Sequence, residues 1–519
     1  MKFKLDASYM MLFFCIIIVF FTLHFMSSIN TVYIDIFGKR IKAKDNILLE
    51  AKDSYYLSYE FVKENIDDEI YFDNISKKIV ISSDKGLIKI KVDDKKININ
   101  FEDKEIKNTG LIENVHKYIS LDVIKESYNI DYVVRNNTIY IFSNVLYNAK
   151  LKRNNESVYK YGSLKSPIVD YVDKRNSIKI IDEKDEFMFV KINDKEVGYI
   201  LKTALTYTKE KNNIDSKIEK NNVYIFADSN NISINDYINV NGVLVDMFAV
   251  TQTTTNIIEK NVSIQFLDKI KEKEFNLYAK IDNGYDLATF DTNTMSQILS
   301  DEMKRIKLIS NINSKIEEYK LDGIVLDFKN LKEKDIANYI QFVKELKAFS
   351  KKDVILNIDA NEYKIYLPVI NYTDFSIVNA YGQRDLKSTV AGSISEINWM
   401  NDIIKVCLNK SDNEKLVIGI PAYSILWTEK NSSIVDSQIY NLKAIESYVE
   451  NNKLELKKVN GQNYVHLERG SLIYRMWLED EFSIKNRLDI IKENNLRGIA
   501  IYKLGYENER LYDILENNY

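Results

Sequence analysis

The sequence predicts an α/β protein whose largest part is a closed barrel of eight strand–helix units. A small β-barrel, a duplicated α+β stalk and an apolar N-terminal helix precede it. Three observations predict this architecture: alternating apolar and amphipathic stretches after about residue 222, an internal repeat, and one long apolar run. We therefore expect four regions, at residues 1–30, 31–146, 147–208 and 220–519.

The composition is that of folded domains. Of 519 residues, 45% are hydrophobic and 29% are charged, which excludes a largely disordered chain. The formal net charge of -4 gives no indication of a polyanion-binding surface, so we expect no nucleic-acid partner.

The apolar run "YMMLFFCIIIVFFTLHFM" occupies residues 9–26 and follows Lys2 and Lys4. Its length suits a helix that crosses a bilayer, and the lysines favour the cytoplasmic side. We expect an uncleaved single-pass anchor in the cytoplasmic membrane, with the rest of the chain extracytoplasmic. The alternative is a cleaved signal peptide and a secreted chain, although no A-x-A-like site follows the run.

Cysteine and histidine are too few for a disulfide or a metal centre. Cys15 lies in the apolar run, which leaves Cys407 as the only thiol beyond it. The three histidines, His24, His116 and His466, are scattered without ligand spacing. We expect neither a metal nor a cofactor.

Residues 31–146 contain two similar copies of one unit. "YLSYEFVKENIDDEIYFDNISKKIVIS" from Tyr56 matches "YISLDVIKESYNIDYVVRNNTIYIFS" from Tyr118. Each copy predicts a short helix followed by a hairpin with alternating apolar residues. The region resembles the copper amine oxidase N-terminal-like domain, which implies a spacer or adhesion module. One histidine, His116, cannot build a copper site, so we expect a structural role.

Residues 147–208 predict short alternating strands that end in "VGYI". This pattern resembles bacterial SH3-like domains, and the resemblance implies binding to peptidoglycan peptides. A passive small barrel is the alternative interpretation.

Eight apolar runs follow: "NVYIFAD", "GVLVDMFAV", "FNLYAKID", "LDGIVLDF", "DVILNID", "FSIVNAY", "KLVIGIPAY" and "RGIAIYKLG". Amphipathic stretches such as "KEKDIANYIQFVKELKAFS" and "SIKNRLDIIKENN" lie between them. Strand–helix alternation predicts parallel pairing, and eight units predict a (β/α)8 TIM barrel with its chemistry at the carboxyl ends of the strands.

Four of these runs end in a carboxylate: Asp228, Asp282, Asp327 and Asp359. The four side chains could line one cleft at the barrel mouth. They could equally cap the following helices or face solvent. Both interpretations stay open, except for Asp327.

The fourth run can be read side chain by side chain, because successive residues of a strand point to opposite faces. Ile324, Leu326 and Phe328 are expected to face the helices. Val325, Asp327 and Lys329 then face the barrel interior, where Asp327 and Lys329 need a partner and could pair with each other.

This run resembles the fourth strand of family 18 glycoside hydrolases, in particular the branch with spore-cortex N-acetylglucosaminidases. That strand carries D-G-x-D-x-D-x-E, and here Asp322, Gly323 and Asp327 match. The segments "VAGSISEINWM", "LVIGIPAYSILW", "YRMWLEDEFSIKNRL" and "RGIAIYKLG" resemble the branch in the same order.

In the family, the glutamate protonates the glycosidic oxygen and the substrate's N-acetyl group acts as nucleophile, an exception to the two-carboxylate scheme. The resemblance gives Asp327 the role of orienting the acetamide. Lys329 occupies the position of the acid and is the wrong group, because its ordinary pKa is near 10.4 and Asp327 favours its charged form.

Further departures concern the sixth and eighth strands. Tyr381 is kept, but Gly382 replaces the polar residue that usually follows it, and Tyr502 replaces the tryptophan that forms the floor of the sugar site. Tyr381, Tyr423, Trp427 and Tyr502 are the candidate aromatic platforms, with Asp359 and Asp282 as further binding candidates. Trp399 and Trp477 are expected only to pack.

These features predict a cell- or spore-envelope protein that binds an N-acetylglucosamine-containing glycan, most simply peptidoglycan, without normal hydrolysis. One alternative is an active glycosidase that uses a displaced acid such as Glu362 or Glu507. A second alternative is a scaffold for envelope proteins.

Overall fold

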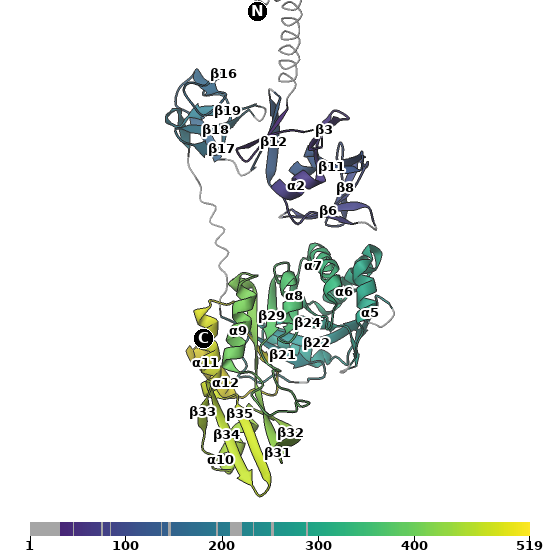
Figure 1. Cartoon of the computed structure of the whole chain (residues 1–519), viewed down its shortest axis with the longest axis vertical. Helices are drawn as coiled ribbons and strands as arrows, with labels where there is room; N and C mark the ends of the chain where they lie inside the picture. Colours follow the sequence, from purple (N-terminus) through teal and green to yellow (C-terminus); the bar gives the residue numbers. More distant parts are fainter. Residues whose placement is uncertain are drawn as a thin grey trace, which may run out of the picture. The chain divides into compact units, whose positions relative to one another are not determined.

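The computed structural model describes residues 32–518, apart from 45, 74–75, 84, 136, 144–146, 194–195, 208–220, 232, 251–253 and 287–288. The chain divides into two compact units, residues 1–214 and 215–519, which Figure 1 shows in purple to blue and in teal to yellow.

The prediction of a single-pass membrane protein is corrected. No helix among the described residues is long and apolar enough to cross a membrane. The run at residues 9–26, on which that prediction depended, lies outside the described residues.

The first unit contains the predicted repeat. Each copy has a strand, a seven-residue helix and a hairpin, and the helices α2 and α3 begin after Ser58 and Ser120, whose hydroxyls accept from Phe61 N and Val123 N. The central strands of the copies, β4 and β11, pair antiparallel in one sheet. The elements are β1 (Tyr33–Ile36), β2 (Lys39–Lys42), β3 (Leu48–Ala51), β4 (Ser54–Ser58), α2 (Tyr59–Asn65), β5 (Tyr71–Asp73), β6 (Lys78–Ser83), β7 (Gly86–Lys91), β8 (Lys96–Ile99), β9 (Glu102–Glu105), β10 (Gly110–Glu113), β11 (His116–Ser120), α3 (Leu121–Ser127), β12 (Ile130–Arg135) and β13 (Thr138–Ser143).

A small antiparallel β structure follows the repeat in the chain. Its strands lie in the order β16-β15-β19-β18-β17-β14-β20 around a core of its own. The bacterial SH3-like assignment stays a prediction. The elements are β14 (Tyr147–Leu151), β15 (Glu156–Tyr159), β16 (Ile168–Val172), β17 (Ile178–Lys184), β18 (Phe187–Ile192), β19 (Glu196–Leu201), η1 (Lys202–Ala204) and β20 (Leu205–Tyr207).

The second unit is an eight-stranded parallel barrel, as predicted. Its order is β21-β36-β30-β29-β28-β27-β24-β22, and pairing of β21 with β22 closes the ring. All eight predicted runs form these strands, which are β21 (Asn222–Asp228), β22 (Gly242–Val250), β24 (Asn276–Asp282), β27 (Gly323–Asp327), β28 (Asp353–Asp359), β29 (Phe375–Asn379), β30 (Leu416–Pro421) and β36 (Gly498–Tyr502).

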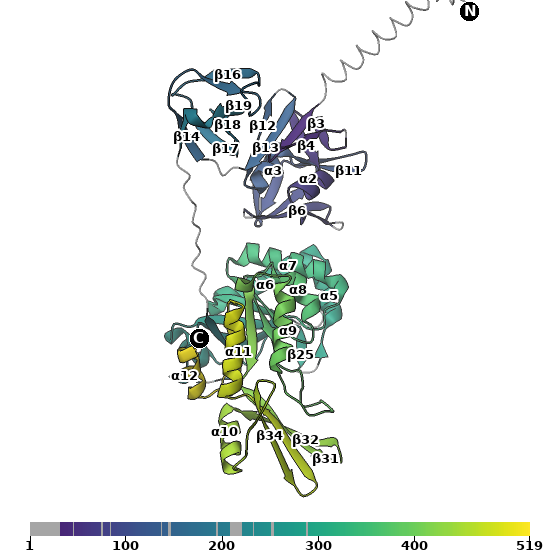
Figure 2. The ribbon, with the colours of Figure 1, turned by 60° about the vertical axis from the view of Figure 1, so that its left-hand side comes forward.

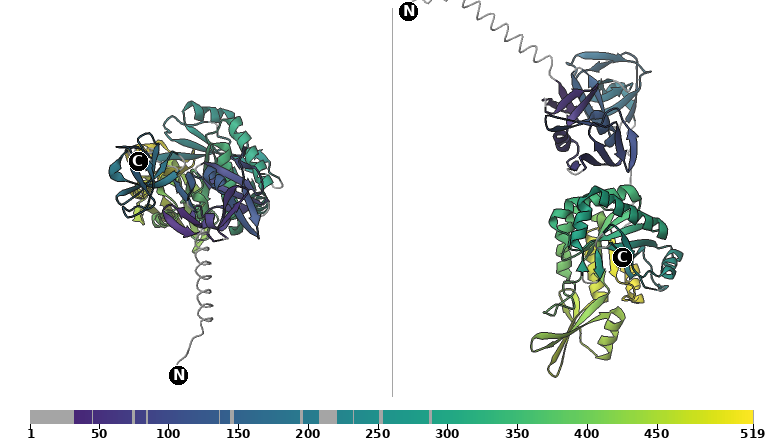
Figure 3. Two further views of the ribbon diagram at one scale, coloured as in Figure 1. Left: turned by 90° about the horizontal axis from the view of Figure 1, so that it is seen from above. Right: turned by 90° about the vertical axis from the view of Figure 1, so that its right-hand side faces the viewer.

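Helices lie outside the strands (Figures 2 and 3). The prediction of eight strand–helix units is wrong in one place, because no helix lies between β21 and β22 in the described part of residues 229–241. That stretch is rich in Asn and Asp, which favour turns. The outer elements are β23 (Ile257–Glu259), α4 (Ile264–Glu272), β25 (Gly284–Asp286), β26 (Thr289–Phe290), α5 (Thr292–Ser300), α6 (Glu302–Tyr319), η2 (Glu333–Asp335), α7 (Ile336–Ser350), α8 (Tyr363–Ile370), α9 (Ile397–Leu408), η3 (Asn413–Lys415), α11 (Glu481–Glu493) and α12 (Glu509–Asn518).

An inserted α+β lobe separates β30 from α11 and projects from the barrel in Figures 1 and 2. It is a five-stranded antiparallel sheet of order β32-β31-β35-β34-β33 with one helix. Its elements are β31 (Tyr423–Lys430), β32 (Ser433–Asn441), α10 (Leu442–Asn451), β33 (Lys457–Val459), β34 (Gln462–Arg469) and β35 (Leu472–Leu478).

The alternation predicted for the fourth barrel strand is confirmed. Ile324, Leu326 and Phe328 belong to the large core between strands and helices. Val325 belongs instead to the smaller apolar core inside the barrel. Asp327 and Lys329 therefore continue the inner face toward the mouth.

Candidate functional site

Asp327 is the centre of the polar layer inside the barrel mouth. Its side chain is buried, and its Oδ1 accepts from Lys329 Nζ at 2.7 Å and from Asn357 Nδ2 at 2.8 Å. Its Oδ2 accepts from Lys280 Nζ at 3.1 Å. Burial alone would raise the pKa of Asp327, but the two lysines outweigh it and hold that pKa below its ordinary value.

Lys329 lies between two carboxylates. Its ammonium is 2.7 Å from Asp327 Oδ1 and 2.9 Å from Asp359 Oδ2, and its side chain is 11% exposed. Burial would lower the pKa of Lys329, but Asp327 and Asp359 outweigh it and raise that pKa. The raised pKa keeps Lys329 charged near neutral pH and makes its ammonium a weak proton donor.

The main chain around position 329 is fixed by groups other than the lysine side chain. Asn283 holds both main-chain groups of residue 329: its Oδ1 accepts from Lys329 N at 2.8 Å, and its Nδ2 donates to Lys329 O at 3.1 Å. The Tyr366 hydroxyl donates to Phe328 O at 2.6 Å. These contacts hold the main chain of residues 328 and 329 independently of the ion pairs of the lysine side chain.

All four strand-end aspartates form ion pairs with lysines. Asp327 and Asp359 share Lys329, as described above. Lys503 pairs with Asp228, and Lys260 lies 2.6 Å from Asp282 Oδ2. Asp282 is therefore buried within the ionic layer, as Asp327 is, whereas Asp228 and Asp359 are about half exposed.

Four tyrosines form a cluster that lies beside the ionic layer. The ring centroids of Tyr381 and Tyr502 are 5.2 Å apart, and those of Tyr423 and Tyr502 are 6.0 Å apart. Tyr506 lies 6.0 Å from Tyr423 by the same measure. Burial raises the pKa of Tyr381 well above its ordinary value, so its phenol stays protonated and keeps a hydrogen-bond donor.

Trp427 does not belong to this cluster. It is fully buried, packs with Ile394 and Ile425, and donates from Nε1 to Gly392 O at 2.9 Å. The prediction of Trp427 as a ligand platform is therefore wrong, because no face of its ring is open. The roles predicted for the other site residues stay predictions.

The two candidate displaced acids differ in position. Glu362 accepts a hydrogen bond from Asn330 N at 3.4 Å. The charges of Lys329, Asp359 and Asp327 also influence its pKa. Burial is the main cause that raises the pKa of Glu362. Burial also raises the pKa of Glu507. Its carboxylate instead interacts with Tyr237 and Tyr512, and it raises the pKa of both phenols.

Several polar residues of the mouth were missed by sequence reasoning: Lys260, Lys280, Asn283, Asn357 and Asn379. One signal was available, since Lys280 alternates with Tyr278 and Asp282 on the third strand and must share their inward face. No group of three or more His, Cys, Asp or Glu side chains that could hold a metal occurs among the described residues.

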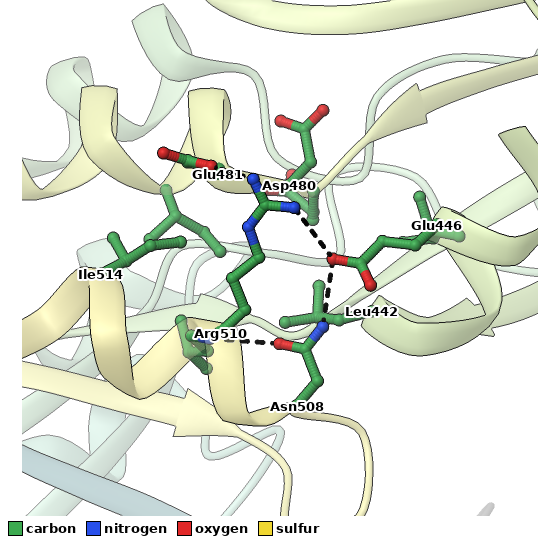
Figure 4. A pocket seen from close by; sticks show the side chains of 11 residues that line it. Leu442, Glu446, Asp480, Glu481, Asn508, Arg510 and Ile514 are labelled. Atoms are coloured by element: carbon green, nitrogen blue, oxygen red, sulfur yellow. Dashed lines mark hydrogen bonds and ion pairs between the residues drawn. The ribbon is translucent and has the colours of Figure 1, made fainter. Parts of the chain in front are cut away.

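A separate pocket lies on the outside of the barrel, where α10, α11 and α12 meet (Figure 4). Ile445, Ile484 and Ile514 give it an apolar floor, while Arg510 reaches toward Glu446 and Glu481 across it.

Comparison with protein families gives two matches. The model described as glycosyl hydrolases family 18 matches residues 197–507, and the model described as copper amine oxidase N-terminal domain matches residues 35–141. The resemblances to family 18 and to the copper amine oxidase N-terminal domain are confirmed.

Among curated proteins, the chain is similar to the uncharacterized glycosylase YvbX of Bacillus subtilis, at 24% identity over 286 residues, covering 50% of this chain and 81% of the relative. It is also 24% identical over 243 residues to the cortical fragment-lytic enzyme of Bacillus subtilis, covering 41% of this chain and 56% of the relative. The chain thus spans little more than half the length of that enzyme.

Two solved structures share the fold. The spore cortex-lytic enzyme SleL of Bacillus cereus superimposes with a TM-score of 0.52 at 15% identity, covering 62% of this chain and 78% of that one. SleL of Bacillus megaterium gives a TM-score of 0.51 at 17% identity, covering 63% and 80%. Identities this low show the fold alone.

Proposed function

The chain belongs to glycosyl hydrolase family 18, and from this premise we propose that its barrel binds an N-acetylglucosamine-containing glycan, such as peptidoglycan, without normal hydrolysis. The observation that carries the proposal is Lys329. It stands where the family resemblance implies the acid, and carboxylates hold it charged on both sides.

The remaining mouth supports binding. Tyr381, Tyr423 and Tyr502 supply aromatic faces and phenol groups, which suit the apolar faces and hydroxyls of a pyranose ring. Asp359 is about half exposed, which leaves carboxylate oxygens for ligand hydroxyls. The similarity to the cortical fragment-lytic enzyme of Bacillus subtilis makes peptidoglycan the first glycan to test.

The first experiment uses residues 31–519 with purified peptidoglycan, with and without stem peptides, and with chitooligosaccharides. Pelleting with the glycan and release of reducing ends are scored together for wild type, Lys329→Glu and the exposed control Lys334→Met. We expect wild type and control to pellet and to release nothing. A wild type that releases reducing ends at rates typical of a hydrolase would contradict the proposal.

Lys329→Glu tests whether the pocket is otherwise competent. Asn283 and Tyr366 hold the main chain there, so the new carboxyl would take the position of the lysine. A carboxyl beside Asp327 gains a raised pKa, which suits a general acid. We expect this variant to release reducing ends above the wild-type background.

One observation favours the alternative of an active glycosidase. Glu362 is near enough to Lys329 and Asp359 to interact with their charges, and burial raises its pKa. If Glu362 is a displaced acid, wild type releases reducing ends and Glu362→Gln abolishes the release. Scaffolding without any ligand would instead appear as failure to pellet with every glycan.

The N-terminal regions extend the proposal. We assign residues 31–146 a spacer role and the small β structure at 147–208 a contact with peptidoglycan stem peptides. The comparison of peptidoglycan with and without stem peptides tests the second role. Removal of residues 147–208 should weaken pelleting only where the peptides are present.

A further inference from the structure

Two buried amides continue the contacts of Asp327 around the inner face of the barrel. Asn357 on β28 donates from Nδ2 to Asp327 Oδ1 at 2.8 Å, and Asn379 on β29 donates from Nδ2 to Asn357 Oδ1 at 3.1 Å. Asp327, Asn357 and Asn379 are 4%, 6% and 3% exposed. The row ends at Asn379 Oδ1, which is buried and has no hydrogen-bond partner among the described residues.

The direction of these hydrogen bonds follows from the charge at one end. An ionised carboxylate only accepts, so Asn357 must turn its NH2 group toward Asp327. Its carbonyl oxygen then faces Asn379, which must in turn present its own NH2 group. The acceptor left over is Asn379 Oδ1, as observed.

The neighbouring strand is shaped to admit the end of the row. A Cβ atom on Gly419 of β30 would lie 2.4 Å from Asn379 Oδ1 and 3.1 Å from Tyr381 Cε1. Only glycine lets the Asn379 amide of β29 and the ring of Tyr381, which follows β29, approach β30 this closely. Three neighbouring strands therefore contribute to the row, in addition to β27 itself.

Charged groups face Asp327 from every side of the mouth. Lys280 and Asp282 come from β24, and Asp246 comes from β22. Lys329 follows β27, while Asp359 and Glu362 follow β28. Tyr381 of the sixth strand and Tyr366 of α8 complete the titratable neighbours.

We propose that Asn357 and Asn379 are positioning residues, a hydrogen-bond relay of fixed direction that holds Asp327 as an oriented anion. The part of this inference that concerns ligand rests on the proposed glycan binding. The relay itself concerns only the folded protein, and the two can be tested separately.

A double-mutant cycle on thermal unfolding tests the relay. Asn379→Asp places a second acceptor at the far end, so Asn357 cannot donate to both ends at once. We expect the melting temperature of the barrel at pH 7 to fall by about 5 °C or more. With Asp327→Asn in the same chain, the hydrogen bonds can reverse, so that residue 327 donates to Asn357 and Asn357 donates to the new anion. The fall in melting temperature caused by Asn379→Asp should then be less than half as large.

Asp359→Asn is the matched control. Asp359 and Asn379 are direct Cα partners in the β28–β29 pairing, but Asp359 is not in the relay. Simple repulsion between carboxylates predicts that Asp359→Asn relieves Asn379→Asp as well as Asp327→Asn does. Equal relief by both, or relief by neither, overturns the relay.

A neutral cycle covers the case in which Asn379→Asp does not fold. Asn379→Leu interrupts the relay without adding charge. Asp327→Asn should therefore lower the melting temperature less in the Asn379→Leu chain than in wild type. The cost of Asp359→Asn should be the same in both chains. A cost of Asp327→Asn that is unchanged by Asn379→Leu overturns the inference.

Glycan affinity gives the functional readout. We expect Asn379→Leu and Asn357→Leu to weaken chitooligosaccharide binding about equally, by about tenfold, and to add little to Asp327→Asn. Wild-type affinity in both leucine variants overturns the positioning role. If wild type itself binds no glycan while the unfolding cycles behave as expected, the proposed function fails and the relay stands.

Discussion

At the scale of single residues, most polar side chains of the barrel mouth help to keep Asp327 ionised. Because its pKa is lower in the folded chain than the ordinary value near 3.9, Asp327 contributes stability that is fully present above that value. The contribution is lost as the pH falls toward the lower, folded-state pKa. Low pH should therefore remove the stability that the ion pairs of Asp327 with its two lysines contribute at neutral pH.

Asp327→Asn makes this testable. We expect the substitution to lower the free energy of unfolding of the barrel by about 3 kcal/mol at pH 7, because it leaves the buried Lys329 and the partly buried Lys280 with fewer counter-ions. The difference from wild type should shrink as the pH falls from about 5 to 2. Urea unfolding at several pH values measures it, with Asp402→Asn, an exposed aspartate, as the control. A difference that does not change with pH would contradict the assignment.

How far the sequence predicts such a site depends on which strand each residue lies on. The pairing of Lys329 with Asp327 was predictable, because both follow from one strand and its alternation. Lys280 and Asn357 contact the same carboxylate from β24 and β28, and only the strand order and register bring them there. Trp427 failed as a prediction because β31 belongs to the inserted lobe and its ring is covered by residues 391–394.

At the scale of single elements, the repeat allows one feature to be tested twice. Ser58 and Ser120 cap α2 and α3 with the same geometry, each 3.1 Å from the nitrogen it accepts from. We expect Ser58→Ala and Ser120→Ala each to lower the free energy of unfolding of the first unit by about 1 kcal/mol.

Chemical denaturation measures both losses, and Ser58→Asp should restore most of the stability because aspartate also caps. Ser120→Asp should not, because the Ser120 hydroxyl also donates to Asn108 O at 2.7 Å and a carboxylate cannot. Losses that differ between the two positions by more than about 1 kcal/mol would show that the copies do not hold their helices in the same way.

The sequence does not predict the inserted lobe. Its strands carry segments that resemble the family, and these lie within the range predicted for the barrel. A buried ion pair joins the end of this lobe to the barrel: Arg487 Nη2 of α11 lies 2.6 Å from Glu479 Oε1, with both side chains fully buried. The same guanidinium donates to Ser395 O, just before α9. One side chain thus connects three segments.

Arg487→Leu and Arg510→Leu form a matched comparison. Arg510 also bridges carboxylates, those of Glu446 and Glu481, beside which Figure 4 shows it. Its side chain is 61% exposed. We expect Arg487→Leu to cost about 3 to 5 kcal/mol of barrel stability, since it leaves Glu479 buried and unpaired. Arg510→Leu should cost about 1 kcal/mol or less. Equal losses in urea unfolding would contradict this ranking.

For the molecule as a whole, alternation of apolar runs was sufficient to predict the eight barrel strands, because each run is buried on both faces in a parallel sheet. What the sequence did not reveal is that two modules of the first unit share a core. Val133 and Phe142 of the repeat pack with Phe189 and Val197 of the small β structure.

This shared core is closed by an ion pair between Lys191 and Asp131, both buried, which again joins the two modules. Cooperative units of a protein coincide with contiguous packed cores. We therefore expect the repeat and the small β structure to exchange amide hydrogens as one unit, in spite of their separate folds.

Phe189→Ala tests this coupling in the full chain. The ring lies 4.9 Å from Tyr199 in its own module and 5.7 Å from Tyr140 of the repeat, by ring centroids. Its loss should cost about 3 kcal/mol and lower hydrogen-exchange protection in β12 and β13 as much as in β17 to β19. The control Tyr171→Ala, on β16 and exposed, should change neither region. Protection that falls only in β17 to β19 would mean that the repeat is stable without its neighbour, and that the two modules behave as independent domains on one chain.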